Sequence, residues 1–367
     1  MNTVTPRIFV AATEQNDGKT TTCVGLFAAL RKRLGRIGYI KPVGQRFVRV
    51  DGMSIDEDTV LIDTTYRVHT PLEAMSPIAV EPDFTRRYIE TSNHDQLVRK
   101  IRTAFDRAAW EKDFVIIEGS GHAGVGSVFD LSNAGVAATL HSKVILVTRG
   151  GIGRPVDEIA LNKALFDKAG VEVIGAIVNK VLPSKYPLVS EFAGKGLARI
   201  GVELLGCIPE EPKLTKPSLG IIRKSIKGKF IGENSRGDAP VHHVVIGGLS
   251  SGKAARILAP GTLVVTPGDR EDLILAALAA SGKDAGRGLA GVIISDGDEA
   301  DPEILETIQR AGVPVISSPL DAYAIACAIH SMTVKTLPGE YEKIDAIQAM
   351  IERHVNVDRL LQRLTSA

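Results

Sequence analysis

The sequence has few cysteines, and they are far apart. Cys23, Cys207 and Cys327 form no C-x-x-C pair, whereas zinc sites and disulfide frameworks need cysteines at characteristic spacings. We therefore expect all three to be small buried hydrophobic residues in a reducing compartment, without disulfides or zinc.

An excess of one charge is also missing. With 44 Lys and Arg against 43 Asp and Glu, the formal net charge is +1, which gives no electrostatic basis for binding nucleic acid or an anionic membrane. No apolar run approaches the roughly 18 residues of a membrane span. The N-terminal segment MNTVTPRIFV leads straight into a strand pattern, which argues against a signal peptide. We expect a cytoplasmic protein with neither a nucleic-acid nor a membrane partner.

The sequence does contain an alternation of strand and helix patterns. Several strand candidates are short continuous apolar runs, as in parallel strands covered on both faces. Strands are expected over Arg7–Ala12, Tyr39–Val43, Phe114–Glu118, Lys143–Thr148, Val173–Asn179 and Glu203–Ile208, and helices over Lys19–Leu34, Asn93–Trp110, Pro155–Ala169 and Lys185–Ile200. This order predicts a doubly wound α/β domain with its ligand at the carboxyl ends of parallel strands. The Gly-Lys-Thr at 18–20, between the first strand and the first helix, makes it a domain of the P-loop NTPase type.

A stretch rich in proline and charge, PEEPKLTKPS at 209–218, interrupts this pattern. We predict a P-loop domain over 1–210, a linker over 211–217, a smaller α/β domain over 218–335 and a helical tail over 336–367. Asp358 is a candidate cap for the last helix. The second domain is expected to have strands Val241–Gly247, Thr262–Thr266, Gly291–Ser295 and Val313–Ser317 and helices Glu271–Ala280, Pro302–Ala311 and Ala322–Ser331, and the tail helices Tyr341–Glu352 and Val357–Leu364.

The segment Ala11–Thr22, AATEQNDGKTTT, joins the first strand to the first helix. Gly18 lets backbone N–H groups approach a polyphosphate, Lys19 can reach its β and γ oxygens, and the Thr20 hydroxyl can bind Mg²⁺. Thr13 stands where the pattern G-x-x-x-x-G-K-[ST] has its first glycine. We predict nucleotide binding; the alternative is a loop that keeps only the turn that starts the helix.

Other polar residues follow the predicted strands. Lys41 would project beside the phosphates, although a lone lysine is more often a solvated surface residue. Glu118 ends a buried strand, where P-loop proteins hold the acidic partner of Mg²⁺, and Asp58 lies at a helix start, where a carboxylate often only complements the helix dipole. Asn179 could pair with a purine edge, and turn chemistry explains it almost as well.

A second glycine-rich stretch, GGLSSGK at 247–253, also fits the start of the P-loop pattern. Ala254 stands where Ser or Thr should bind Mg²⁺, so we interpret the stretch as a glycine-rich loop and not as a second ATP site. The histidines show no ligand spacing such as H-E-x-x-H, and no metal other than Mg²⁺ is implied.

The first ~210 residues resemble the dethiobiotin synthetase family and, more closely, the similar N-terminal domain of long bacterial phosphotransacetylases. The family loop G-T-D-T-E-V-G-K-T is similar to ATEQNDGKT at 12–20, K-P-V to residues 41–43, and V-E-G-A-G to IEGSG at 117–121. The resemblance implies ATP and Mg²⁺ as cofactors and a homodimer. It implies nucleotide contacts at Thr13, Asn16, Asp17, Gly18, Lys19, Thr20, Thr21 and Asn179, Mg²⁺ ligands at Thr20, Asp58 and Glu118, and catalytic roles for Lys19 and Lys41.

Residues from about 215 to 330 resemble a DRTGG domain, through VVTPGDRED at 264–272 and GVIIS at 291–295, although the Thr-Gly-Gly is absent. Together the two parts are similar to the N-terminal half of long phosphotransacetylases. The acetyltransferase domain of that family is missing from the sequence, so we do not expect acetyl transfer. Gln15 and Gln45 stand where dethiobiotin synthetases have small hydroxyl residues, which weakens the case for that reaction.

Two functions remain open. In the first, an ATP-dependent ligase-type enzyme lets a carboxylate or carbamate attack the γ-phosphate, with Lys19 and Mg²⁺ neutralising charge and Lys41 orienting an unknown small-molecule acceptor. In the second, the chain is a regulatory module that senses a nucleotide or metabolite and acts on a partner enzyme.

Overall fold

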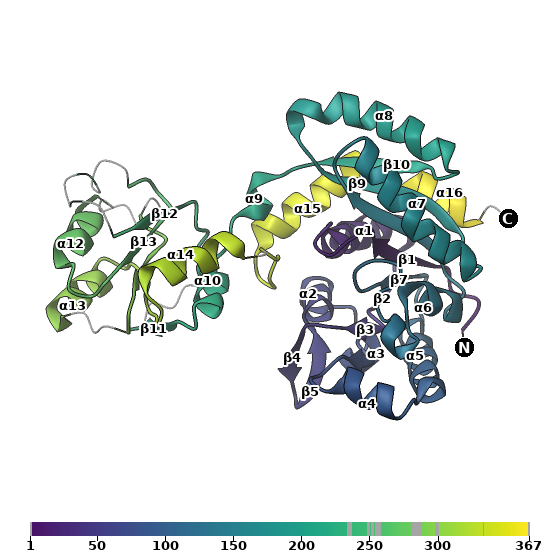
Figure 1. Cartoon of the computed structure of the whole chain (residues 1–367), viewed down its shortest axis with the longest axis horizontal. Helices are drawn as coiled ribbons and strands as arrows, with labels where there is room; N and C mark the ends of the chain where they lie inside the picture. The colour runs from purple at the N-terminus through teal and green to yellow at the C-terminus, as the bar shows by residue number, and fades with distance from the viewer. Residues whose placement is uncertain are drawn as a thin grey trace. The chain divides into compact units, whose positions relative to one another are not determined.

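The computed structural model describes residues 2–232, 237–247, 250, 253, 258–280, 288–297, 301–332 and 334–365. The chain forms two compact units, Met1–Glu211 with Thr336–Ala367, and Pro212–Lys335 (Figure 1). The C-terminal segment, which we expected as a separate tail, therefore lies within the first unit. In the described part of the chain, no helix is both long and apolar enough to cross a membrane.

The first unit is built on a parallel six-stranded sheet with the strand order β10-β9-β8-β1-β7-β2. Every residue of β1 and β7 is buried, because helices cover both faces. This confirms the predicted α/β fold with a parallel sheet. The strands are β1 (Arg7–Ala12), β2 (Ile37–Ile40), β7 (Phe114–Glu118), β8 (Lys143–Arg149), β9 (Val173–Val181) and β10 (Leu204–Pro209).

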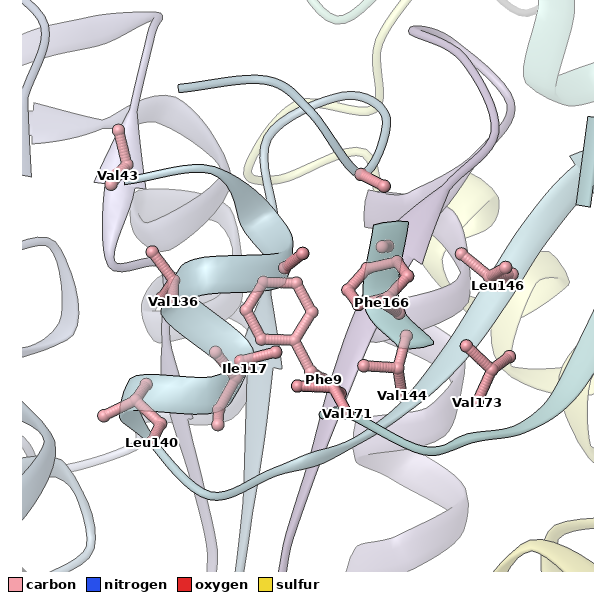
Figure 2. Packing of buried hydrophobic residues seen from close by; sticks show 14 of the residues in the cluster. Phe9, Val43, Ile117, Val136, Leu140, Val144, Leu146, Phe166, Val171 and Val173 are labelled. Atoms are coloured by element: carbon pink, nitrogen blue, oxygen red, sulfur yellow. The ribbon is translucent and has the colours of Figure 1, made fainter. Parts of the chain in front are cut away.

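Helices connect these strands and bury their apolar sides on the sheet. Figure 2 shows Phe9, Ile117 and Val144, from three neighbouring strands, in one cluster with Val136 and Phe166 from the covering helices. The helices of this layer are α1 (Lys19–Leu34), α5 (His94–Ala108), α6 (Asn133–Thr139), α7 (Gly153–Lys168) and α8 (Tyr186–Arg199), with the short 3₁₀ turns η1 (Ser127–Phe129) and η2 (Pro183–Lys185).

The region between β2 and β7 departs from the predicted pattern. The expected strand Tyr39–Val43 is wrong at its end: β2 stops at Ile40, and the Lys41 amide donates to the Met75 carbonyl instead of to the sheet. Pro42, which has no N–H to donate, follows directly. The structure adds β3 (Val43–Gly44) paired with β6 (Ile78–Ala79), a hairpin of β4 (Phe47–Val50) and β5 (Met53–Asp56), and the helices α2 (Glu57–Tyr66), α3 (Leu72–Met75) and α4 (Phe84–Glu90).

The C-terminal helices α15 (Tyr341–His354) and α16 (Val357–Thr365) complete the first unit. Helix α15 lies against α1 where Gly25 has no side chain: a Cβ there would come within 2.1 Å of Ile351 Cγ1. The expected capping role of Asp358 is wrong. Asn356 accepts the Arg359 amide at 2.9 Å, while the Asp358 carboxylate pairs with Arg33.

The second unit is a smaller α/β fold around a five-stranded sheet of order β11-β15-β14-β13-β12, with only the β11–β15 pair antiparallel. Cys327 is exposed on its helix α14, so the expectation that all three cysteines are buried holds only for Cys23 and Cys207. Most of the GGLSSGK stretch lies outside the described residues. The elements are α9 (Pro212–Thr215), α10 (Leu219–Ser225), β11 (Lys229–Ile231), β12 (His243–Ile246), β13 (Thr262–Thr266), α12 (Glu271–Ala280), β14 (Gly291–Ile294), α13 (Pro302–Arg310), β15 (Val315–Ser317) and α14 (Ala322–Ser331).

Candidate functional site

The loop between β1 and α1 ends in a backbone conformation that favours glycine. Gly18 has φ 102° and ψ 29°, in the left-handed region, and directly precedes the first helical residue, Lys19. A Cβ on Gly18 would lie 2.0 Å from Asn179 Nδ2. This geometry leaves the first amides of α1, which have no partner within the helix, available at the positive end of the helix dipole.

Thr13, at the position of the missing first glycine, is buried and holds the loop together. Its Oγ1 lies 2.9 Å from Asp17 Oδ2, from Thr148 Oγ1 and from Glu158 Oε2. Asp17 Oδ2 also accepts the Glu14 amide at 2.8 Å. Burial raises the pKa of Asp17, against the hydrogen bonds from Thr13 and Glu14 that lower it. The hydroxyl therefore takes part in a network that fixes the loop, where a glycine would leave it looser.

Asn179, near the end of β9, makes a hydrogen bond to the backbone of the loop. Its Nδ2 donates to the Asp17 carbonyl at 2.8 Å, and its Oδ1 accepts the Lys180 amide at 2.9 Å. Lys180 Nζ donates to the carbonyl of Asn16, which has φ 65°. In this arrangement the Asn179 amide supports the loop backbone, and its contact with adenine stays a prediction.

The first turn of α1 meets the end of β7. The Thr20 hydroxyl donates to Glu118 Oε1 at 2.8 Å, and the Tyr39 hydroxyl donates to Glu118 Oε2 at 2.9 Å. Thr21, the next residue of α1, is half-buried. The predicted hydroxyl and carboxylate ligands of Mg²⁺ at positions 20 and 118 are thus adjacent, although they come from segments nearly one hundred residues apart.

Lys41 is not a solvated surface residue. Only 7% of it is exposed, and its ammonium contacts Asp58 Oδ2, lies 2.9 Å from Asp56 Oδ1 and lies 3.7 Å from Glu118 Oε1. These carboxylates are between 1% and 5% exposed. Burial alone would lower the pKa of Lys41, but Asp58, Glu118 and Asp56 together hold it above its usual value. We call Lys41, Asp56, Asp58 and Glu118 the buried ion cluster.

Asp56 is a member of this cluster that sequence reasoning missed. Its Oδ1 accepts the Asp58 amide at 2.9 Å and so caps α2, while the same oxygen contacts Lys41. Its Oδ2 is buried and has no hydrogen-bond partner within the described residues. The acidic run 56–58 is visible in the sequence, but its contact with Lys41 depends on how the chain folds between the two segments.

Lys19 lies beside the buried ion cluster. Burial lowers its pKa, the ammonium of Lys41 acts in the same direction, and the carboxylate of Glu118 opposes both. An anionic ligand would restore the favourable environment of a charged ammonium. The site therefore contains two lysines with different surroundings. Lys41 is buried and enclosed by carboxylates, whereas Lys19 is half-buried and has a lowered pKa.

The described residues include no group of three His, Cys, Asp or Glu side chains arranged to hold a metal ion. The ammonium of Lys41 lies between the carboxylates of Asp58 and Glu118. The donors themselves, one hydroxyl and two carboxylates, are the hard oxygen ligands that Mg²⁺ prefers. Thr20, Asp58 and Glu118 therefore fit Mg²⁺ by the chemistry of their oxygen atoms. In this structure the ammonium of Lys41 supplies the positive charge beside the two carboxylates.

Comparison with known families agrees with the division into two α/β parts. Residues 6–218, more than half of the chain, match the family described as an AAA domain (AAA_26). Residues 222–332 match the DRTGG domain. The predicted resemblance to a P-loop domain followed by a DRTGG domain is thereby confirmed.

Curated relatives extend over both parts. A phosphate acetyltransferase of Pseudomonas aeruginosa is 27% identical over 372 residues, covering 97% of this chain and 51% of the relative. One from Nitratidesulfovibrio vulgaris is 24% identical over 373 residues, with the same coverage of 97% and 51%. The chain spans about half the length of these relatives.

Among solved structures, the septum site-determining protein MinD of Pyrococcus horikoshii, complexed with Mg-ADP, is 17% identical. The match covers 57% of this chain and 84% of that chain, with a TM-score of 0.35. A likeness this low does not carry a ligand or an activity over to this protein.

Proposed function

Since the chain belongs to the AAA domain family (AAA_26) and continues into a DRTGG domain, we propose that it is a regulatory module that binds ATP with Mg²⁺. The loop 13–20 would hold the triphosphate, and the nucleotide would change how the module acts on a partner enzyme. The relatives suggest phosphate acetyltransferase chemistry as the regulated activity.

The observation that carries the proposal is the junction of Gly18, Lys19, Thr20 and Glu118. Gly18 frees the helix N-terminus, Lys19 lies in a setting that an anion would improve, and the Thr20 hydroxyl touches the Glu118 carboxylate. Thr20, Asp58 and Glu118 would hold Mg²⁺, which when bound supplies positive charge to the β and γ phosphates. The chain's own contribution is to align the phosphates and to exclude water beneath them.

The enclosure of Lys41 favours sensing over ligation. A catalytic lysine that orients an acceptor must present its ammonium to that acceptor, and here Asp56, Asp58 and Glu118 surround it. We infer that Lys41 serves as an internal counter-ion, which keeps the acids compatible with burial in the absence of a metal. Gln15 and Gln45, in place of small hydroxyl residues, point in the same direction.

A ligase-type enzyme is the second candidate, and the contact of Thr20 with Glu118 beside Lys19 is the observation that favours it. That arrangement is what phosphoryl transfer would need. In this reading Lys41 would leave Asp58 when an acceptor binds and would then contact the acceptor.

Titration calorimetry with Mg²⁺-ATP and a phosphate-release assay distinguish these readings. We expect saturable binding by the wild type, loss of binding in Lys19→Ala, and retained binding in Lys32→Ala, a matched change at an exposed site of the same helix. Sensing predicts no phosphate release above the Lys19→Ala background, whereas release that depends on Lys19 supports the enzyme. Absence of binding at millimolar ATP contradicts both.

A further inference from the structure

The second unit contains a cavity of about 300 Å³. It is formed where the chain enters and leaves this unit: by the segment after α9, by the start of β12, and by the end of α14. The lining residues are Thr215, Lys216, Pro217, Val241, His242, Val244, Ile329, His330, Met332 and Val334.

Backbone pairing brings two basic side chains together in this cavity. The Val241 amide donates to the Pro217 carbonyl at 2.9 Å, so the segments that carry Lys216 and His242 run side by side. Lys216 Nζ lies 2.6 Å from His242 Nδ1. Because an ammonium can only donate, the ring nitrogen accepts, and this leaves the ring Nε2–H as a further donor. Burial and the neighbouring ammonium lower the pKa of His242, in keeping with a neutral acceptor ring.

Among the described residues, no acidic side chain balances the positive charge of this pair. The described part of the lining contains no aspartate or glutamate, and Lys216 has no ion pair with a described carboxylate. The C-terminal turn of α14 adds the negative end of a helix dipole, equivalent to about half an elementary charge. The unit positive charge of Lys216 is larger than this partial negative charge of the helix end. His330, on the same turn, adds another polar group.

Much of the remaining wall is apolar. Val241 is buried, while Val244, Ile329, Met332 and Val334 face the cavity with part of their surface accessible. A cavity of this volume is at the small end of ligand sites. The cavity therefore suits a small amphiphilic ligand, whose anionic end would lie toward the lysine and whose aliphatic body would lie against the valines.

We propose that this cavity binds a small organic anion, a carboxylate or phosphate ester on a short aliphatic chain, through Lys216 and His242. The site is independent of the nucleotide proposed for the first unit. Its lining includes Thr215 and Val334, which in the sequence lie close to the two points where the chain passes from one unit to the other.

The test uses the full chain and three probes that each carry a short alkyl chain: n-butyrate, n-butyl phosphate and neutral n-butanol. Binding is followed by saturation-transfer NMR and calorimetry. We expect one or both anions to bind and butanol not to bind; which anion binds identifies the head group. Lys216→Met should weaken binding at least ~10-fold, the scale of one lost charged hydrogen bond. The exposed Lys224→Met, in the same unit, should leave it within ~2-fold of wild type.

A second variant covers the case in which Lys216→Met fails to fold. Val244→Glu keeps the lysine and adds a carboxylate to the lining, so it should abolish anion binding by repulsion. The proposal is overturned if neither anion binds better than butanol or if binding survives both substitutions. It is also overturned if binding is lost in Lys19→Ala and retained in Lys216→Met, because the anion then occupies the loop of the first unit.

Discussion

Replacing Lys41 with methionine should destabilise the first unit strongly, because it leaves buried carboxylates without their counter-ion. Methionine has nearly the volume of lysine, so the change removes mainly the charge and the hydrogen bonds. The ammonium contacts Asp58, lies 2.9 Å from Asp56 and lies 3.7 Å from Glu118. All of these carboxylates are at most 5% exposed. Removing one partner of a buried ion pair costs about 3–5 kcal/mol, a large part of the 5–15 kcal/mol that is typical of a domain.

The assay is equilibrium urea unfolding of the full chain, followed by a probe in the first unit. A double variant, Lys41→Met with Asp58→Asn, removes the charge of one carboxylate as well. We expect it to recover roughly 1–3 kcal/mol of the loss, because neighbouring charges couple. Lys112→Met is the control: its ammonium donates to the Val68 carbonyl at 2.6 Å, so its loss should cost about 1 kcal/mol.

Magnesium gives an independent readout of the same cluster. With Lys41 replaced, the acids lack a counter-ion, so Mg²⁺ without nucleotide should stabilise the Lys41→Met variant more than the wild type. Two results would contradict this prediction. One is a loss of less than about 1 kcal/mol in the free energy of unfolding of Lys41→Met; the other is a double variant that is less stable than Lys41→Met alone.

Three further predictions concern backbone contacts and pH. Gly18→Ala, at φ 102° and with its Cβ 2.0 Å from Asn179 Nδ2, should cost about 1–3 kcal/mol and abolish Mg²⁺-ATP binding; unchanged urea unfolding and calorimetry would contradict this. Gly25→Ala should lower the melting temperature, because overpacking against Ile351 at 2.1 Å costs about 1–3 kcal/mol and exceeds the gain of about 1 kcal/mol in helix propensity. Burial and Arg353 lower the pKa of His354, so the unfolded chain takes up its proton first and stability should fall as pH drops below about 6.5. His354→Gln should reduce that fall between pH 8 and pH 5, and identical pH profiles of wild type and variant would refute it.

Elements with a strong local signal could be predicted from the sequence. The strand β7 and the helices α1 and α12 begin and end at the predicted residues. Each is an apolar run or an alanine- and leucine-rich segment with a clear break at its ends, so local pattern and burial agree. The alternation of these elements was sufficient for the parallel α/β fold.

The hairpin of β4 and β5 was missed because its strands are short and partly exposed, so they show no apolar run. This omission had a consequence for the site. The hairpin places Asp56 and Asp58 next to Lys41, and such a contact between distant segments has no local signature. The supporting role of Asn179 was missed for the same reason, since it depends on the path of the loop backbone beside β9.

The cavity around Lys216 and His242 carries no sequence motif at all. Its residues come from three segments that are brought together by the pairing of Val241 with Pro217 and by the end of α14. Sequence reasoning finds sites that a contiguous loop builds, such as the one ending at Gly18. Sites assembled from unrelated segments become visible only in the folded chain.

The most direct test of the proposed function is a crystal structure with a non-hydrolysable ATP analogue and Mg²⁺. We predict that the triphosphate lies along the backbone of residues 13–19, with Lys19 on its outer phosphates and the ion beside Thr20 and Glu118. A nucleotide bound elsewhere, or a loop that stays empty at saturating analogue, would contradict it.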